Sequence, residues 1–294
     1  MKKFKIIIVI AFFITSYGCT KDQDIIESKV NIIWTSDWDA QRSILRAFDL
    51  ENGMGVDTIY FPGCCGFDNL NFNKLTKSIL LTYNGSLYDL NASTHEFKFL
   101  TGTSNTSERV TLKLNLDNRN QILYGFEIVD SKYNIVKIDL KNNKFEVILK
   151  SFRQINPNYH TMYSALDEKG QQLYLSLNDS IFSFDIKNKT VEKAIETGTI
   201  SMLQFNPVFN KLNGISFSKD FKFAKLDIYH DYISSVPFSK VINGFYTYST
   251  INENTGDYIF RTGGNEIQIV EQNGNIKNSY TVDGESGLCV QTTN

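Results

Sequence analysis

Apolar and polar residues alternate along most of this chain, in short segments that are separated by polar turns. Five stretches share one phrase and a sixth follows its outline: an alternating segment, an acidic residue, a polar turn and a second alternating segment. The acidic residues of the phrase lie 40 to 50 residues apart, at Asp49, Asp89, Asp139, Asp185, Asp227 and Glu271. A period of two is typical of half-buried β-strands, and turns such as "LKNNK" suit tight hairpins.

A second pair of alternating segments precedes the phrase, as in "VTLKLNLDNRNQILYGFE" and "MYSALDEKGQQLYLSLN". The repeating unit is therefore four short strands in about 45 residues, which is the size and content of a β-propeller blade. The phrases resemble those of the YVTN/NHL/TolB-like group of bacterial propellers over residues 29–294. This resemblance implies an architecture and no particular function.

The repeats predict an all-β fold, a single β-propeller domain over residues 29–294 with six four-stranded blades. Seven blades or an irregular ring are the alternatives. The first repeat lacks its innermost strand, and "SGLCVQTTN" at the end of the sequence supplies an extra one. We expect this C-terminal strand to pair with residues 29–36 and so close the ring, which protects strand edges. An acid repeated in each blade is expected to satisfy a turn and not to do chemistry.

The first 18 residues have the features of a secretory leader. Three lysines precede the apolar run "IIIVIAFFI", which is far shorter than the about 20 residues needed to span a bilayer. Small residues then lead to Cys19, an order that resembles the bacterial lipobox, although Ser16 stands where Leu is common. We expect residues 1–18 to be a lipoprotein signal peptide, Cys19 to be lipidated and residues 19–28 to be an acylated tether. The alternative is an ordinary signal peptide with an incidental cysteine.

The segment after Cys19, "TKDQDIIES", contains two aspartates and one lysine near the anchor. It resembles the surface-export signal of Bacteroidota lipoproteins, and the alternative is a solvated tether. The resemblance implies a protein that is lipid-anchored in the outer membrane, at the cell surface or on the periplasmic side. Its first partner would then be the lipid bilayer, through acylated Cys19.

Charge and motifs exclude several classes of function. The leader carries three of the 30 basic residues and none of the 32 acidic ones, so the remaining net charge is about −5. This balance argues against nucleic acid and against anionic membrane surfaces as partners. The sequence has no GxSxG, HExxH or Gly-rich phosphate motif and no CxxC pairs. We therefore predict no catalytic residue, no metal and no cofactor.

Strand order sorts the loops of a propeller onto two faces. Counting outward from the axis, the turns between strands one and two and between strands three and four share a face and are short. The other connections are longer, and irregular loops on a scaffold usually carry binding residues. The candidate ligand-binding residues on these loops are Trp38, Arg153, Asn158, Tyr159, His160, Phe245 and Tyr246. Such aromatic and polar groups suit a small molecule or glycan, and the alternative is that they pack between blades.

These observations favour a membrane-anchored lipoprotein whose propeller binds an unknown small molecule, glycan or protein ligand without catalysis. The alternative is a propeller hydrolase or lyase that acts on a glycan or small molecule at the axial mouth. That enzyme would use His160 with Arg153, and acids would converge on His160.

Three further cysteines would enter an oxidising compartment after export, where disulfides persist. Cys64 and Cys65 fall in the loop that leaves the first blade, and Cys289 falls in the closing strand of the same blade. One expectation is therefore a disulfide from Cys289 to Cys64 or Cys65. Separate buried thiols or a vicinal bridge are the alternatives.

Overall fold

The computed structural model describes fourteen stretches of the chain, in which every regular element is a β-strand. They are residues 31–39, 41–62, 67, 69–83, 85–102, 112–154, 162–177, 180–196, 200–217, 223–228, 233–237, 246–262, 266–282 and 286–291. The predicted leader, Cys19 and the predicted tether lie outside the described residues.

Over these ranges the strands pair into six four-stranded antiparallel sheets, and in each sheet the strands are named from the innermost outward. Sheet 1 holds β24 (Ser286–Gln291), β1 (Ile32–Trp38), β2 (Arg42–Asp49) and β3 (Gly55–Pro62). Sheet 2 holds β4 (Asn69–Asn73), β5 (Ser78–Tyr83), β6 (Ser86–Asn91) and β7 (Phe97–Gly102). Sheet 3 holds β8 (Leu112–Asp117), β9 (Ile122–Val129), β10 (Lys132–Asp139) and β11 (Lys144–Gln154).

The remaining sheets repeat this order. Sheet 4 holds β12 (Met162–Asp167), β13 (Gln172–Leu177), β14 (Ser180–Asp185) and β15 (Thr190–Glu196). Sheet 5 holds β16 (Ile200–Asn206), β17 (Lys211–Phe217), β18 (Phe223–Ile228) and β19 (Ile233–Pro237). Sheet 6 holds β20 (Tyr246–Ile251), β21 (Tyr258–Thr262), β22 (Glu266–Val270) and β23 (Ile276–Thr281).

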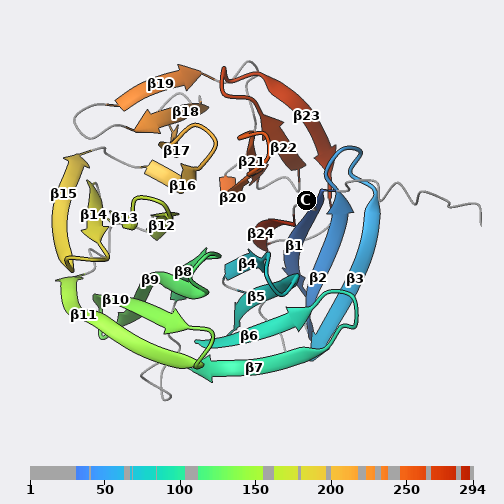
Figure 1. Ribbon diagram of the computed structural model, residues 1–294. Helices are drawn as coiled ribbons and strands as arrows, with labels where there is room; N and C mark the ends of the chain where they lie inside the picture. Colours follow the sequence, from blue (N-terminus) through green and yellow to red (C-terminus); the bar gives the residue numbers. More distant parts are fainter. Residues whose placement is uncertain are drawn as a thin grey trace, which may run out of the picture.

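The sheets stand around a common axis (Figure 1). Their innermost strands contact one another in the order β4, β8, β12, β16, β20, β24 and back to β4. The predicted pairing of the C-terminal strand is confirmed, because β24 lies antiparallel to β1 with Ile32 opposite Gln291 and Trp34 opposite Cys289. The all-β, propeller-like fold class is likewise confirmed.

The core is divided among the spaces between neighbouring sheets. Trp34 and Ile79 meet between sheets 1 and 2, and Phe126 and Phe184 meet between sheets 3 and 4. Middle strands are buried on both faces, as the sequence SILLTY of β5 shows, whereas the outermost strand β7 begins with three exposed residues. Burial of each such core side chain contributes about 1.5–3 kcal/mol, so the packing between sheets is the main force that holds the ring together.

The described hairpins, apart from the one that begins at Glu271, share one design, in which an Asp or Asn side chain caps the turn. Asp139 accepts hydrogen bonds from the Lys141 backbone N–H (2.9 Å) and the Asn142 side chain (2.7 Å), and these bonds lower the pKa of its carboxyl. The fourth residue after the cap, Asn143, closes the turn with a φ of 50°. Asn and Asp favour such turns because their side chains bond to the backbone that follows.

The predicted role of the repeated acids in turns is confirmed at three sites, Asp49, Asp139 and Asp185. It is wrong at Asp89, because in sheet 2 the cap is Asn91, which accepts a hydrogen bond from the Ser93 N–H (2.9 Å). The turn of sheet 2 therefore starts two residues later than the repeated phrase implies.

The ring has two faces that differ in their connections. The hairpin face carries the turns that join the first to the second and the third to the fourth strand of a sheet; those described are residues 50–54, 74–77, 92–96, 118–121, 140–143, 168–171, 186–189, 207–210, 252–257 and 271–275. The loop face carries the other connections. Most of the loops between one sheet and the next lie outside the described residues.

Candidate functional site

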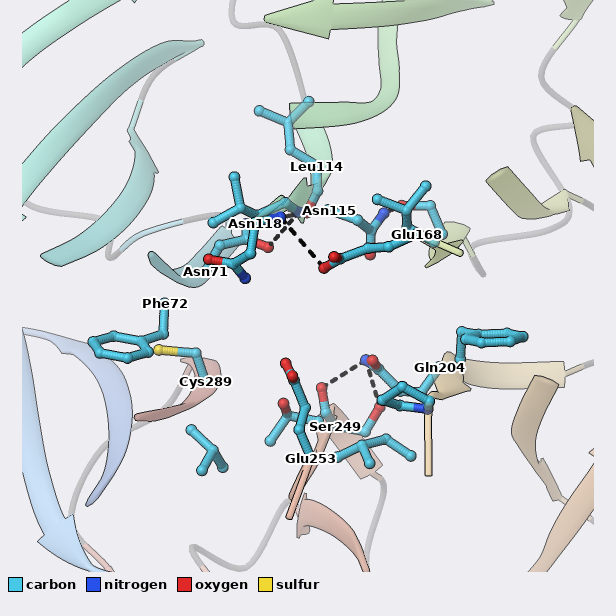
Figure 2. Close-up of a pocket in the computed structure, with 18 of the residues that line it drawn as sticks. Asn71, Phe72, Leu114, Asn115, Asn118, Glu168, Gln204, Ser249, Glu253 and Cys289 are labelled. Carbon is cyan, nitrogen blue, oxygen red and sulfur yellow. Dashed lines mark hydrogen bonds between the residues drawn. The ribbon is translucent and has the colours of Figure 1, made fainter. Parts of the chain in front are cut away.

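The axis of the ring contains a cavity of about 420 Å³. Its described walls are the innermost strands of all six sheets, and its rim consists of the turns that follow these strands on the hairpin face. Figure 2 shows side chains from different strands surrounding this opening. The described lining therefore reaches solvent at the face that the sequence analysis took to be structural.

Amide and hydroxyl side chains form a polar belt on the cavity wall. The Asn69 amide donates a hydrogen bond to the Leu114 carbonyl (2.8 Å), and the Asn115 amide donates to the Ser164 hydroxyl (2.7 Å). On the other side, the Gln204 amide donates to the Ser249 carbonyl (2.8 Å; Figure 2). These bonds join successive sheets and fix the orientation of the amides. Each amide has more donors and acceptors than these bonds use, which suits it for contacts with a polar ligand.

A cation–π contact crosses the axis beside the polar belt. The Lys113 ammonium group, on β8 of sheet 3, lies 5.8 Å from the centre of the Tyr248 ring, on β20 of sheet 6. Lys113 stands two positions before Asn115 on its strand, and Tyr248 stands one position before Ser249. The contact is typical of a cation above an aromatic face, and it places a positive charge next to the belt.

The rim of the cavity carries charged side chains of both signs. Lys74, Glu168 and Glu253 each follow in sequence the Asn or Asp residue that caps a turn. Lys74 forms an ion pair with Glu253 across the rim, between sheets 2 and 6. Glu168 accepts a hydrogen bond from the Asn118 backbone N–H (3.3 Å), and Asn118 in turn accepts one from the Lys74 N–H (2.8 Å). Figure 2 shows Glu168 and Glu253 extending toward the same opening from opposite sides.

The carboxyl group of Glu168 has an altered acidity. Burial raises its pKa to about 7, and the nearby Asp117 and Glu253 carboxylates raise it as well. The hydrogen bond from the Asn118 N–H, which is the second-largest effect, and the charge of Lys74 lower the pKa, but they do not offset the effect of burial. A partly buried carboxyl of this kind gains or loses its proton near neutral pH, so the charge of the rim changes there.

We expect Glu168→Gln to stabilise the protein at about pH 8 and to have little effect at about pH 4. The pKa of Glu168 rises from 4.5 to about 7 on folding, so the folded chain holds this proton more tightly and stability falls as pH rises through that window. Partial exposure reduces the gain for the amide to about 1–2 kcal/mol. Urea unfolding across this pH range measures it, with the exposed Glu192→Gln as the control. Equal pH profiles for wild type and Glu168→Gln would contradict the assignment.

The structure places three of the predicted ligand-binding residues, and two of them, Trp38 and Arg153, are not among the residues that line the described cavity. Trp38 ends β1 at the loop face and is 45% exposed. Arg153 lies on β11, the outermost strand of sheet 3, where its guanidinium group sits 4.5 Å from the centre of the Phe182 ring of sheet 4. Tyr246 begins the innermost strand β20. For Arg153, packing between neighbouring sheets is thus the observed role.

The other predicted ligand-binding residues, Asn158, Tyr159, His160 and Phe245, lie outside the described residues. A site on the loop face stays a prediction. The residues of the polar belt were missed because they sit in ordinary alternating strands. Alignment of the innermost strands of the repeats on their turn caps would have revealed the signal, since Asn71, Asn115 and Gln204 each stand two residues before a cap.

Cys289 is a free thiol in this structure, buried beside Trp34 and adjacent to the cavity. Burial raises the pKa of this thiol to about 12, so it is un-ionised at neutral pH. Cys64 and Cys65 lie outside the described residues, and the predicted bridge to one of them gains no support from the free state of Cys289.

The described part of the chain offers neither a metal cluster nor a spanning helix. Among the described residues, His, Cys, Asp and Glu side chains nowhere gather in a group of three or more that could hold a metal ion. The described ranges contain no helix with the length and apolar character required to cross a membrane.

Comparisons with known proteins support the architecture. No family model and no curated protein matches the sequence. Among solved structures, the chain resembles TolB from Acinetobacter baumannii, with a TM-score of 0.67 and 12% identity over 88% of this chain and 65% of TolB. It also resembles a chain of a nidogen–laminin complex, with a TM-score of 0.68 and 9% identity over 88% of this chain and 98% of that one. At such identities the likeness shows the fold alone, a β-propeller domain.

Proposed function

We propose that this protein is a lipid-anchored binding protein whose six-bladed β-propeller holds a small, polar ligand in its axial cavity. Each of the six sheets is one blade, and the pairing of β24 with β1 closes the ring. The observation that carries the proposal is the polar belt, a set of oriented amides and hydroxyls around a cavity of about 420 Å³. Binding sites for small molecules commonly have volumes of about 300–1,000 Å³.

The chemistry of the cavity favours a ligand that is rich in hydroxyl or amide groups. Amides such as Asn115 and Gln204 can donate and accept at once, which matches the alternating donors and acceptors of a glycan. The rim pairs Lys74 with Glu253, so it offers no excess of one charge to a strongly ionic ligand. A glycan or a similarly polar, uncharged small molecule fits this lining best.

The evidence for the proposed membrane anchor comes from the amino-acid sequence. The basic, apolar and small-residue order that ends at Cys19 supports acylation of this residue, and the acidic segment after it supports a Bacteroidota lipoprotein of the outer membrane, at the surface or on the periplasmic side. A protein ligand is a further possibility for the loops, because one structural neighbour of this fold is seen in a complex of nidogen with laminin.

A propeller hydrolase or lyase is the second candidate, and one observation favours it. Glu168 and Glu253 both reach the cavity, and the pKa of Glu168 is raised to about 7, which suits a general acid near neutral pH. His160, which the sequence analysis considered for this role, lies outside the described residues. Product formation that Glu168→Gln abolishes, with binding retained, would support the enzyme.

The ligand site is tested with a panel of mono- and oligosaccharides and amino acids, measured by thermal shift and then calorimetry. We expect Asn115→Leu and Gln204→Leu each to weaken binding of a hit roughly tenfold, because each removes a hydrogen-bonding amide from the cavity wall. Asn188→Ala, in an exposed hairpin turn of sheet 4, is the control and should leave affinity unchanged. Full affinity in both Leu variants, together with its loss in Tyr159→Ala or His160→Ala, would place the site on the loop face.

Acylation is tested by metabolic labelling with a palmitate analogue. We expect the full-length chain to be labelled and Cys19→Ala to lose the label completely, because no other cysteine follows a leader sequence. Cys289→Ala serves as the control and should be labelled like wild type. Equal labelling of wild type and Cys19→Ala would contradict the lipobox assignment.

A further inference from the structure

The chain enters the propeller at the hairpin face. The carbonyl of Asn31, just before β1, accepts a hydrogen bond from the Leu50 N–H (2.8 Å) at the base of the turn 50–54. Cys19 is separated from Asn31 by residues 20–30, a segment whose fully extended length is at most about 40 Å. A lipid on Cys19 would therefore keep the bilayer within about 40 Å of this face.

Large apolar side chains are exposed on the hairpin face. Leu75, at a turn of sheet 2, is 71% exposed, and Met54, at a turn of sheet 1, is 68% exposed. Five others on or next to these turns are also exposed: Val56, Phe97, Phe99, Val208 and Phe209. Exposed apolar side chains that gather on one face mark an interaction site, whereas scattered single ones need no explanation.

The arrangement of these side chains fits a flat partner. Leu75, Met54, Val208 and Phe209 sit on turns, and the other three lie on β3 and β7, which follow turns. They belong to sheets 1, 2 and 5, which stand at different places around the ring (Figure 1), so these side chains do not share one groove. Phe209 lies against Gly256 of the neighbouring turn, which holds its ring at the surface. A planar bilayer can contact separate turns at once, and Leu, Met and Phe are side chains that enter the boundary between headgroups and acyl chains.

The same turns carry charges of both signs. The exposed lysines and arginines of the described hairpin turns are Lys77, Arg119, Lys141, Lys169, Lys187 and Lys189. The exposed acidic residues there are fewer: Glu51, Glu96 and Glu253. Carboxylates at the bases of the same turns, among them the caps Asp49, Asp139 and Asp185, balance these basic residues, so the fit to a bilayer rests on the apolar side chains and not on charge.

We propose that the hairpin face rests on the bilayer in which Cys19 is anchored, with Leu75, Met54, Phe99 and Phe209 at the level of the headgroups. This orientation rests on the proposed lipid anchor. It turns the mouth of the axial cavity toward the membrane and leaves the loop face directed away from it.

Fluorescence quenching tests the orientation. The full-length, acylated chain is bound to vesicles of phosphatidylethanolamine and phosphatidylglycerol that carry a doxyl-labelled lipid. Leu75→Trp and Phe209→Trp report on the hairpin face, and Tyr60→Trp, exposed on β3 nearer the loop face, is the matched control. The native Trp34 is buried and Trp38 lies at the loop face, so the wild-type background should be quenched little. We expect the two reporters to be quenched at least about threefold more than the control.

The outcomes separate the orientation from the anchor. Labelled, vesicle-bound protein with equal quenching at Leu75→Trp and Tyr60→Trp overturns the orientation and leaves the anchor intact. If the wild-type protein is not labelled, the lipid anchor is contradicted, and vesicle sedimentation then tests the hairpin face by itself. Vesicle binding that Leu75→Ser and Phe209→Ser abolish supports the hairpin face as the surface that contacts the bilayer. Absence of vesicle binding overturns the proposed orientation. A photo-crosslinker at position 75 that captures one discrete protein in cells, without quenching in vesicles, shows a protein partner and also overturns the proposal.

Discussion

Removal of residues 286–294 should abolish cooperative folding. This segment contains β24, which is the innermost strand of sheet 1 although it comes last in the sequence. Its loss strips β1 of a ladder partner, removes Cys289 from its place beside Trp34, and breaks the hydrogen bond from the Trp34 indole to Gln291 (3.0 Å). It also separates β20 from β4, which both contact β24 around the axis.

The expected loss exceeds about 5 kcal/mol, which is comparable with the whole stability of an ordinary domain. Circular dichroism and urea unfolding measure it. The control is a chain that ends at Gln291, which keeps β24 and lacks only residues 292–294, and it should unfold like wild type. A sharp urea transition at the wild-type midpoint after removal of 286–294 would show that the ring does not depend on β24.

The strands could be predicted because each of them carries its own signal. Alternation marked the strands of every repeat, and the missing first strand of the first repeat indicated that Cys289 and its neighbours would complete that sheet. The capping role of Asp139 and Asp185 was also readable, since Asp is followed at once by polar turn residues. Asp89 misled the prediction because the phrase is preserved in sheet 2 while the turn has moved to Asn91.

The cavity could not be predicted in the same way, because it exists only once the ring is closed. Lys74 and Glu253 are 179 residues apart, and no local pattern relates them. Asn115 and Gln204 look like ordinary polar positions of half-buried strands until both strands are known to be innermost. Loop composition drew attention to residues such as Arg153, which proves to lie on the outermost strand of sheet 3 over Phe182.

Close packing behind the polar belt makes one glycine critical, and Gly125→Ala should destabilise the protein by about 3 kcal/mol or more. Gly125 lies on β9, opposite Leu114 of β8. A Cβ atom there would overlap the Lys113 carbonyl oxygen and stand 2.9 Å from the Leu114 Cα. These are backbone atoms, so no rotation of a side chain relieves the clash, and β8 must move or lose its pairing with β9.

This movement would also disturb the cavity, because β8 carries Lys113 and Asn115 on its wall and is held on its other side by the hydrogen bond from Asn69. We therefore expect Gly125→Ala to lower both the urea midpoint and the affinity for any ligand found in the panel. Gly55→Ala is the matched control, since a Cβ atom at this exposed position of β3 meets nothing within 4 Å, and its stability should stay within about 0.5 kcal/mol of wild type. If Gly125→Ala unfolded at the same urea concentration as Gly55→Ala, β8 would be free to move, and the polar belt could not be the rigid surface on which the proposed binding site depends.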